Sequence, residues 1–151
     1  MKVFLCSYNG FSLAVPMDKV SSVMLITENN NHKSLMHFSS DNGNTYISLP
    51  LLFNCPSLNM KHGIILKNSD SDDDIAIKDK TILLTTEIEC ESEISDDKIL
   101  TIPKTLNVFK FSLFFSGILF YRRQPKISEN LILLLNPEHM VQKINKEKTN
   151  D

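Results

Sequence analysis

The sequence contains 151 residues, of which 42% are hydrophobic and 23% are charged, and its formal net charge is −2 at pH 7. This length suits one ordinary domain or two intimately packed half-domains, and it is sufficient to bury a core without a metal ion or disulfide bonds. The small negative charge provides no general attraction to nucleic-acid phosphates or to anionic lipids. Nucleic-acid binding is therefore not expected.

The three cysteines are odd in number and far apart in the chain, at Cys6, Cys55 and Cys90. Neither a disulfide framework nor a Cys-x-x-Cys metal or redox site is expected from this spacing. The apolar stretch at the N-terminus turns polar too early for a signal-peptide core. The apolar runs at 109–121 and 131–135 are interrupted or too short to cross a bilayer, which argues against direct membrane insertion. We expect the protein to stay in the cytoplasm.

Short β-type runs separated by turn residues predict a mainly β chain with a barrel or sandwich architecture. The first two runs flank Asn9-Gly10, a pair that favours the type I′ turn of a β-hairpin. In chain order, the expected strands are 3–8, 11–15, 20–26, 35–38, 45–49, 64–66, 75–77, 81–88, 99–102, 109–113, 114–121 and 131–135. In the third strand, the residues available to a core are Val20, Val23 and either Met24 or Leu25.

The remaining segments read as connections and as one helix. The acidic tract 70–74 is expected to form the tip of a hairpin, and the acidic stretch 89–97 a surface loop. A C-terminal helix is expected at 137–144, because an acidic residue lies early and a lysine late, and Asn136 precedes it as an N-cap. The charged tail 145–151 is expected to fray.

Residue types that carry catalysis or bind metals do not form a recognisable motif. The histidines are scattered and lack the spacing of a helical zinc pair; they are His32, His37, His62 and His139. The tract 70–74 resembles the start of a calcium loop, but Ile75 and Thr81 occupy the positions of its glycine and its bidentate glutamate. No nucleophile elbow or glycine-rich phosphate loop is present. We therefore expect no catalytic, metal-binding or cofactor-binding residues and infer that the protein is not an enzyme.

The order of the motifs resembles that of the CheW-like domain, the fold of chemotaxis adaptors and of the regulatory domain of the CheA kinase. The segment 13–23 is similar to the family's apolar strand, proline, short spacer and Val-x-Glu-Val run, with Ser22 at the family's glutamate. The segment 43–52 is similar to its Arg-Gly and Pro-Val-x-Asp-Leu region, with Asn42 at the arginine. Further along the chain, 75–79 resembles the family's apolar strand that ends in Val-Asp, 115–118 its late aromatic-x-Gly-apolar strand, and 131–138 its closing strand and short helix.

The resemblance implies a single domain, 1–151, made of two packed five-stranded SH3-like β-barrels with a short C-terminal helix. It implies a non-enzymatic adaptor that couples a CheA-type histidine kinase to the cytoplasmic tip of a chemoreceptor. The residues that would line or support partner contact are Val20, Ser22, Val23, Asn42 and Gly43. For three of these residues a structural role is favoured over a contact role, because Val20 and Val23 are core candidates and Gly43 suits a turn with positive φ.

The departures from the family pattern concern charged groups. Ser22 and Asn42 replace residues whose charges would fix orientation in an interface. A divergent scaffold with a different partner therefore stays open, as do a small-ligand-binding or enzymatic β-barrel and a structural subunit of an unrelated complex. An exposed apolar patch would favour the adaptor, whereas a concave pocket with converging polar groups would favour the ligand-binding barrel.

Overall fold

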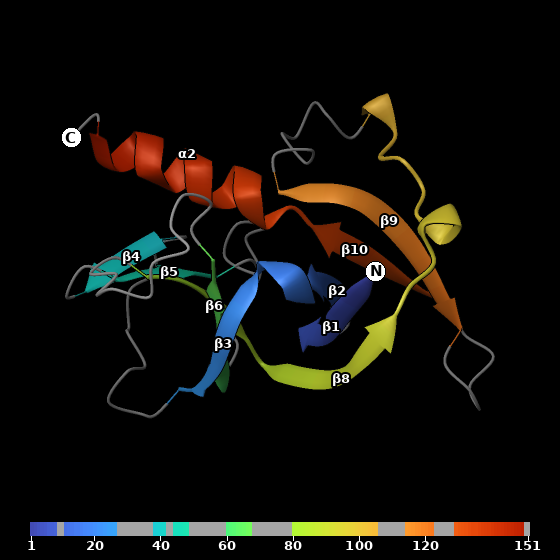
Figure 1. The fold of residues 1–151 in the computed structure, drawn as a ribbon, viewed down its shortest axis with the longest axis horizontal. Helices are drawn as coiled ribbons and strands as arrows, with labels where there is room; N and C mark the ends of the chain where they lie inside the picture. The colour runs from blue at the N-terminus through green and yellow to red at the C-terminus, as the bar shows by residue number, and fades with distance from the viewer. Residues whose placement is uncertain are drawn as a thin grey trace.

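The structure is a computed structural model that describes residues 1–8, 11–26, 38–41, 44–48, 60–67, 80–105, 114–122 and 129–149. Its strands form two sheets of five strands each, and one α-helix ends the described chain (Figure 1). The mainly β architecture with two packed halves and a C-terminal helix is as expected. Within the described residues, however, each sheet is open rather than closed into a barrel.

The first sheet joins strands from the two ends of the chain. In spatial order it contains β8 (Glu87–Glu93), β1 (Lys2–Tyr8), β2 (Phe11–Pro16), β10 (Glu129–Leu135) and β9 (Phe115–Arg122). The β1–β2 and β9–β10 pairs are antiparallel, whereas β2 and β10 run parallel. The run 131–135 was expected to be a central strand, and β10 does have a neighbour on each side. Its leucines and isoleucine from 132 to 135 are all buried, as a strand covered on both faces requires.

The second sheet is built from the middle of the chain. In spatial order it contains β3 (Val20–Leu25), β6 (His62–Leu66), β7 (Thr81–Thr85), β5 (Asn44–Ile47) and β4 (Phe38–Asp41). β5 and β7 are parallel, and the other neighbours are antiparallel. A single residue, Gly63, allows close packing inside this sheet, because a Cβ there would lie 2.8 Å from the Cγ2 atom of Ile82.

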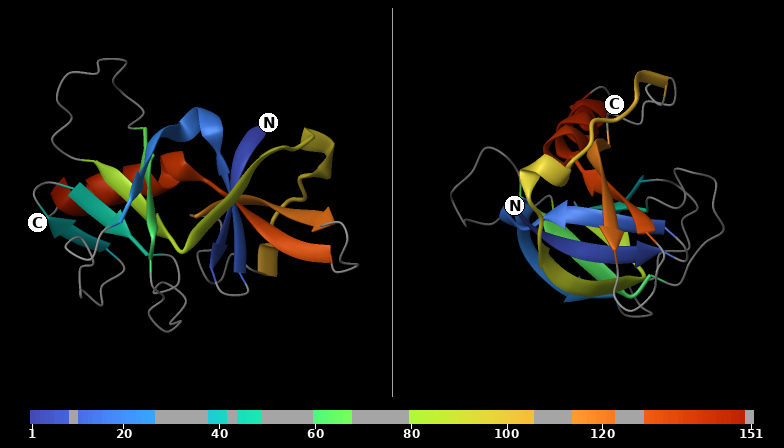
Figure 2. Two further views of the ribbon diagram at one scale, coloured as in Figure 1. Left: turned by 90° about the horizontal axis from the view of Figure 1, so that it is seen from below. Right: turned by 90° about the vertical axis from the view of Figure 1, so that its right-hand side faces the viewer.

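The chain passes between the sheets at three points, which Figure 2 shows from two sides. A 3-10 turn, η1 (Met17–Lys19), joins β2 to β3. β7 continues into β8 through a bend at Thr86. After β10, the helix α2 (Pro137–Thr149) extends alongside the second sheet (Figures 1 and 2).

A hydrophobic core lies between the two sheets and is closed by α2. The first sheet contributes residues such as Leu13 and Leu133, the second contributes Ile64 and Leu83, and α2 contributes Met140. We call this cluster the shared core. A separate cluster lies on the other side of the first sheet, and it comprises Val3, Leu5, Ala14, Ile94, Leu119, Ile132 and Leu134. The two halves are thus held together by a continuous apolar interior, which fixes their relative orientation.

Three expectations about the strands were wrong. The run 81–88 is split into β7 and β8, and β8 extends to Glu93 through most of the acidic stretch that we expected to be a loop. The 3-10 turn η3 (Asp96–Lys98) follows it. In place of a strand at 99–102 there is a single β-bridge, between Leu100 and Ile118.

The C-terminal helix is longer than expected, because it continues to Thr149 where we predicted a frayed tail from Asn145. Its start agrees with the prediction, since Asn136 immediately precedes Pro137 at the first helical position. The Asn9-Gly10 turn, the acidic tract 70–74 and the expected strands 75–77 and 109–113 lie outside the described residues. None of the described helices is long and apolar enough to span a membrane.

Candidate functional site

The sequence places its proposed partner-binding residues mainly on β3, and the structure puts them in different environments. Val20, at the start of the strand, is half-buried and packs against the shared core. Ser22 and Val23 are exposed. Asn42 and Gly43 lie outside the described residues, so their position relative to β3 stays a prediction.

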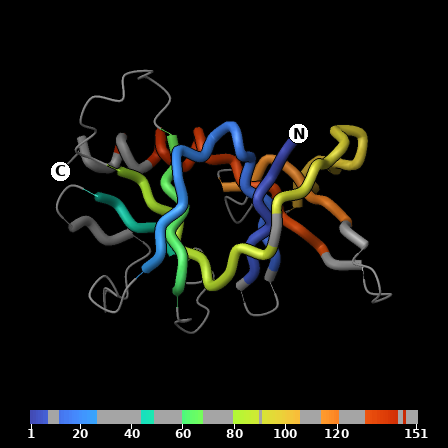
Figure 3. Tube along the Cα trace, turned by 60° about the horizontal axis from the view of Figure 1, so that its bottom comes forward, coloured from blue at the N-terminus to red at the C-terminus, as the bar shows by residue number. Residues whose placement is uncertain are grey.

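Val23 and Leu25 form an exposed apolar edge that the sequence alone did not reveal. Their side chains are 42% and 70% exposed, although we expected Val23, and Leu25 as an alternative to Met24, to be available to a core. The reason is topological, because β3 is the end strand of the second sheet and pairs with β6 on one side only within the described chain. Val23 lies opposite Ile64, a shared-core residue, so its side chain shares the face of the sheet that bounds this core. We call Val23 and Leu25 the β3 edge, and Figure 3 shows β3 beside β6.

A second exposed apolar surface lies on the first sheet. Leu131 on β10 is paired with Phe120 on β9. Leu100 forms a β-bridge with Ile118, which precedes Phe120 by two residues on β9. The exposed fractions are 54% for Phe120, 51% for Leu131 and 48% for Leu100. Residues two apart on a strand, and residues paired across strands, share a face, so these three side chains continue the row that Ile118 begins in the shared core. We call Leu100, Phe120 and Leu131 the β9 patch.

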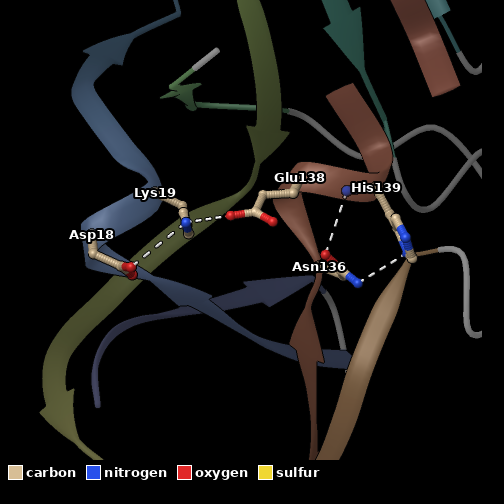
Figure 4. Close-up of polar contacts among 5 residues, drawn as sticks. All are labelled: Asp18, Lys19, Asn136, Glu138 and His139. Carbon is tan, nitrogen blue, oxygen red and sulfur yellow. Dashed lines mark hydrogen bonds and ion pairs between the residues drawn. The ribbon is translucent and has the colours of Figure 1, made fainter. Parts of the chain in front are cut away.

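An ion pair joins the η1 turn, which leads into β3, to the first turn of α2. The Lys19 ammonium group donates a hydrogen bond to Oε1 of Glu138, and Oδ2 of Asp18 lies 4.0 Å from the same nitrogen (Figure 4). The bond to Glu138 raises the pKa of Lys19, and the bond to Lys19 lowers the pKa of Glu138. Because the pair is exposed to solvent, its main effect is to connect the crossover at β3 to the helix rather than to add much stability.

The start of α2 is capped by the side chain that the sequence predicted. Oδ1 of Asn136 accepts a hydrogen bond from the backbone N–H of His139 at 3.4 Å, and Nδ2 of Asn136 lies 3.1 Å from Nδ1 of His139 (Figure 4). An N-cap acceptor satisfies one of the free N–H groups in the first helical turn. This cap holds Glu138 at the position where it reaches Lys19.

Threonine side chains fix the second crossover, between β7 and β8. The hydroxyl of Thr85 donates to the backbone oxygen of Glu87 at 3.0 Å, and the hydroxyl of Thr86 donates to the backbone oxygen of Ser7 on β1. Thr85 also forms a side-chain hydrogen bond with Cys6. The bend is therefore held by the side chain of the last residue of β7 and by that of Thr86 itself.

Chemically reactive groups are few in the part of the chain that the structure describes. Burial raises the pKa of the Cys6 thiol to about 12, with Glu89 adding to the increase and the bond to Thr85 opposing it. The thiol is therefore protonated at neutral pH and does not supply a thiolate nucleophile. No group of three or more His, Cys, Asp or Glu side chains within the described ranges is arranged to hold a metal ion.

Comparison with known proteins identifies the architecture. No protein-family model matches the chain, and no curated protein matches it in sequence. Among solved structures, the chain is similar to the scaffolding protein TtCheW from Thermoanaerobacter tengcongensis, with a TM-score of 0.59 and 14% sequence identity. The similarity covers 89% of this chain and 83% of that chain. The order of motifs in the sequence and the arrangement of the two sheets therefore agree, and the protein has a CheW-like fold.

Proposed function

We propose that the protein is a non-enzymatic scaffold of a cytoplasmic chemotaxis system, which couples a CheA-type histidine kinase to the cytoplasmic tip of a chemoreceptor. The observation that carries this proposal is the presence of two exposed apolar surfaces on different sheets, the β3 edge and the β9 patch. An adaptor needs two docking surfaces that are held in a fixed relation, and apolar surfaces rimmed by polar residues mark protein interaction sites. The CheW-like fold supports the same assignment by analogy.

Both exposed surfaces adjoin buried residues of the shared core. Val23 is paired with Ile64 and Phe120 lies two residues from Ile118, and both buried partners belong to the shared core. β3 and β9 thus belong to separate sheets (Figure 1), and both strands contribute side chains to the same cluster. A partner at either surface would meet a rigid sheet, which keeps the entropy cost of binding low.

Each proposed contact residue has a defined part in this function. Val23, being exposed, would contact a partner directly, and Ser22 would border the contact. Val20 would hold β3 in place, since its side chain packs against the shared core. Asn42 and Gly43 are assigned to the same partner surface by the family resemblance alone.

A divergent scaffold with a different partner is the second candidate. The observation that favours it is the exposed Ser22, which stands where the family pattern has a glutamate. A hydroxyl can accept and donate hydrogen bonds but lacks the charge that would orient a basic partner. Such a protein would keep the two docking surfaces and use them for another pair of proteins.

The test is a titration of the purified protein against the kinase regulatory domain and against a receptor tip fragment from the same cell. We expect both to bind, with Val23→Asp and Phe120→Asp each weakening one of the two interactions while circular dichroism shows a folded protein. Val20→Asp should unfold the protein or abolish binding. If neither partner binds at high micromolar concentration, the divergent scaffold is supported instead. If both surface variants bind both partners normally, neither surface is a docking site.

A further inference from the structure

We propose that the β3 edge pairs with the β3 edge of a second copy of this chain, so that the second sheets of two molecules join across a two-fold axis. The proposal rests on the side chains, the charges and the backbone groups without a strand partner in the described part of the chain, compared among three of its four edge strands, β3, β8 and β9. It does not depend on the identity of any partner protein.

The backbone of β3 offers the groups that such pairing needs. The N–H of Ile26 donates to the backbone oxygen of Lys61 at 2.8 Å, so the even-numbered residues at this end of β3 face β6. Because the N–H and C=O groups of neighbouring residues in a strand point in opposite directions, those of Val23 and Leu25 point away from β6. The strand pairs with β6 alone within the described residues, which leaves these four groups without a strand partner.

The spacing of these groups is self-complementary. If Met24 lies opposite Met24 of the other copy, Val23 faces Leu25 and Leu25 faces Val23 in an antiparallel ladder. Both are then hydrogen-bonded pairs, which exchange four N–H to C=O bonds. Apolar side chains meet apolar side chains on the face that bounds the shared core, and a two-fold axis makes each contact occur twice.

The edge strands β3 and β8 differ in charge. The stretch 20–26 contains no charged residue, so self-pairing brings no like charges together. On β8, the exchange of hydrogen bonds between Met1 and Ile94 shows that Glu91 and Glu93 carry the outward backbone groups. Self-pairing there would place exposed glutamates opposite glutamates, which is the device by which proteins protect an edge strand from association.

The β9 edge is already partly used by the chain itself. Ile118 exchanges hydrogen bonds of 2.8 and 2.9 Å with Leu100, so part of the outer side of β9 is occupied. β8 is thus protected by charge and β9 by a bridge, whereas among the described residues neither kind of protection is found on β3. A strand that is uncharged, apolar and open on one side favours strand addition.

Self-pairing would also regulate the docking surface, a consequence that rests on the proposed function. The dimer buries Val23, which the proposed partner contacts. Free protein at high concentration would then hold its β3 edge covered, and partner binding would have to displace the second copy.

The experiment is sedimentation equilibrium of the full chain from micromolar to near-millimolar concentration, without any partner. We expect a reversible monomer–dimer equilibrium that Leu25→Lys weakens by about tenfold or more, because the altered cross-strand contact occurs twice. Leu25 is exposed in the monomer, so this variant should fold, which circular dichroism checks. Phe120→Lys, which places the same charge on the β9 patch, should leave the equilibrium unchanged.

Amide hydrogen exchange identifies the edge directly. The N–H groups of Val23 and Leu25 should exchange more slowly as concentration rises, whereas that of Met24, which faces β6, should not change. A protein that stays monomeric throughout, or a dimer that Leu25→Lys leaves intact or Phe120→Lys abolishes, overturns the proposal. Failure of the kinase and receptor titrations has no bearing on these measurements, so the two proposals fail separately.

Discussion

Leu131 on β10 lies directly opposite Phe120 on β9, and both side chains are about half exposed although they continue a row of buried residues. Two residues further along β10, Leu133 lies opposite Ile118 and both are buried in the shared core. Along both strands, a shift of two residues therefore takes this face from the buried interior to the surface.

This step predicts a large difference between two leucines on the same face of the same strand. Leu133→Ala removes a buried side chain from the shared core and should lower the free energy of unfolding by about 2–5 kcal/mol. Leu131→Ala should lower it by roughly 1 kcal/mol or less, because the side chain is half exposed already. Urea denaturation of the two variants measures the difference, and equal losses would contradict the assigned burial.

The ion pair between Lys19 and Glu138 predicts how the stability of the protein changes with pH. The pKa of Glu138 is lowered from 4.5, so its contribution is complete above that pH and is lost as the pH falls through the lower folded-state pKa. The pKa of Lys19 is raised from 10.5, so its contribution is complete below that pH and is lost as the pH rises through the higher folded-state pKa.

The difference in free energy of unfolding between the wild type and Glu138→Gln should therefore be small and constant near neutral pH. It should decrease at strongly acidic and at strongly alkaline pH. Denaturant titrations at a series of pH values provide the measurement. Lys19→Gln is the matched control and should give the same profile. A gap that grows on acidification would show that Glu138 acts through some other group.

Gly117 is expected to resist substitution for lack of space. A Cβ atom at this position would lie 2.5 Å from the Cγ2 atom of Ile99 and 3.2 Å from the backbone oxygen of Leu100. Gly117→Ala should therefore destabilise the protein by about 1–3 kcal/mol through overpacking. The exposed neighbour provides the control, since Ser116→Ala should change stability by no more than about 0.5 kcal/mol.

A second variant separates steric conflict from other effects of the new methyl group. Ile99→Ala removes the γ2 methyl that the new Cβ would meet, so the double variant should be more stable than the sum of the two single losses predicts. Thermal unfolding of the four proteins gives the coupling. Strict additivity would mean that the contact with Ile99 is not the cause.

Of the two threonine hydroxyl groups at the crossover from β7 to β8, that of Thr86 connects the bend to β1 and can be tested alone. Thr86→Val keeps the shape of the side chain but removes the donor to the backbone oxygen of Ser7. It should lower the free energy of unfolding by about 1 kcal/mol. Thr86→Ser keeps the hydroxyl and should retain most of the stability. Guanidinium unfolding compares the two, and a valine variant as stable as the wild type would show that the bond contributes nothing.

Much of the architecture follows from local sequence pattern. The paired strands β1 and β2, the buried run in β10 and the helix start at Asn136 are all visible as alternation, apolar runs and capping residues. These features depend on neighbours in the chain or on burial from both sides. They are therefore the features that a sequence specifies most directly.

What escaped prediction depends on position within a sheet. Residues 89–93 of β8 were read as part of a loop because they are acidic, but glutamates suit an edge strand while Ile88 packs against the shared core. Val23 and Leu25 have the periodicity of core residues, and only the terminal place of β3 exposes them. The β9 patch was missed because it arises from the pairing of β9 with β10, which no single segment encodes.

The order of strands has a consequence for synthesis on the ribosome. All strands of the second sheet lie between Val20 and Thr85, so that sheet is complete in the nascent chain while β9 and β10 have yet to emerge. β2 must wait for its partner β10, which is synthesised much later. The amino group of Met1 donates a hydrogen bond to the carbonyl oxygen of Ile94, a residue 93 positions further along the chain. Because contacts between distant residues form slowly, β1 and β2 should be the segments on which chaperones act during biogenesis.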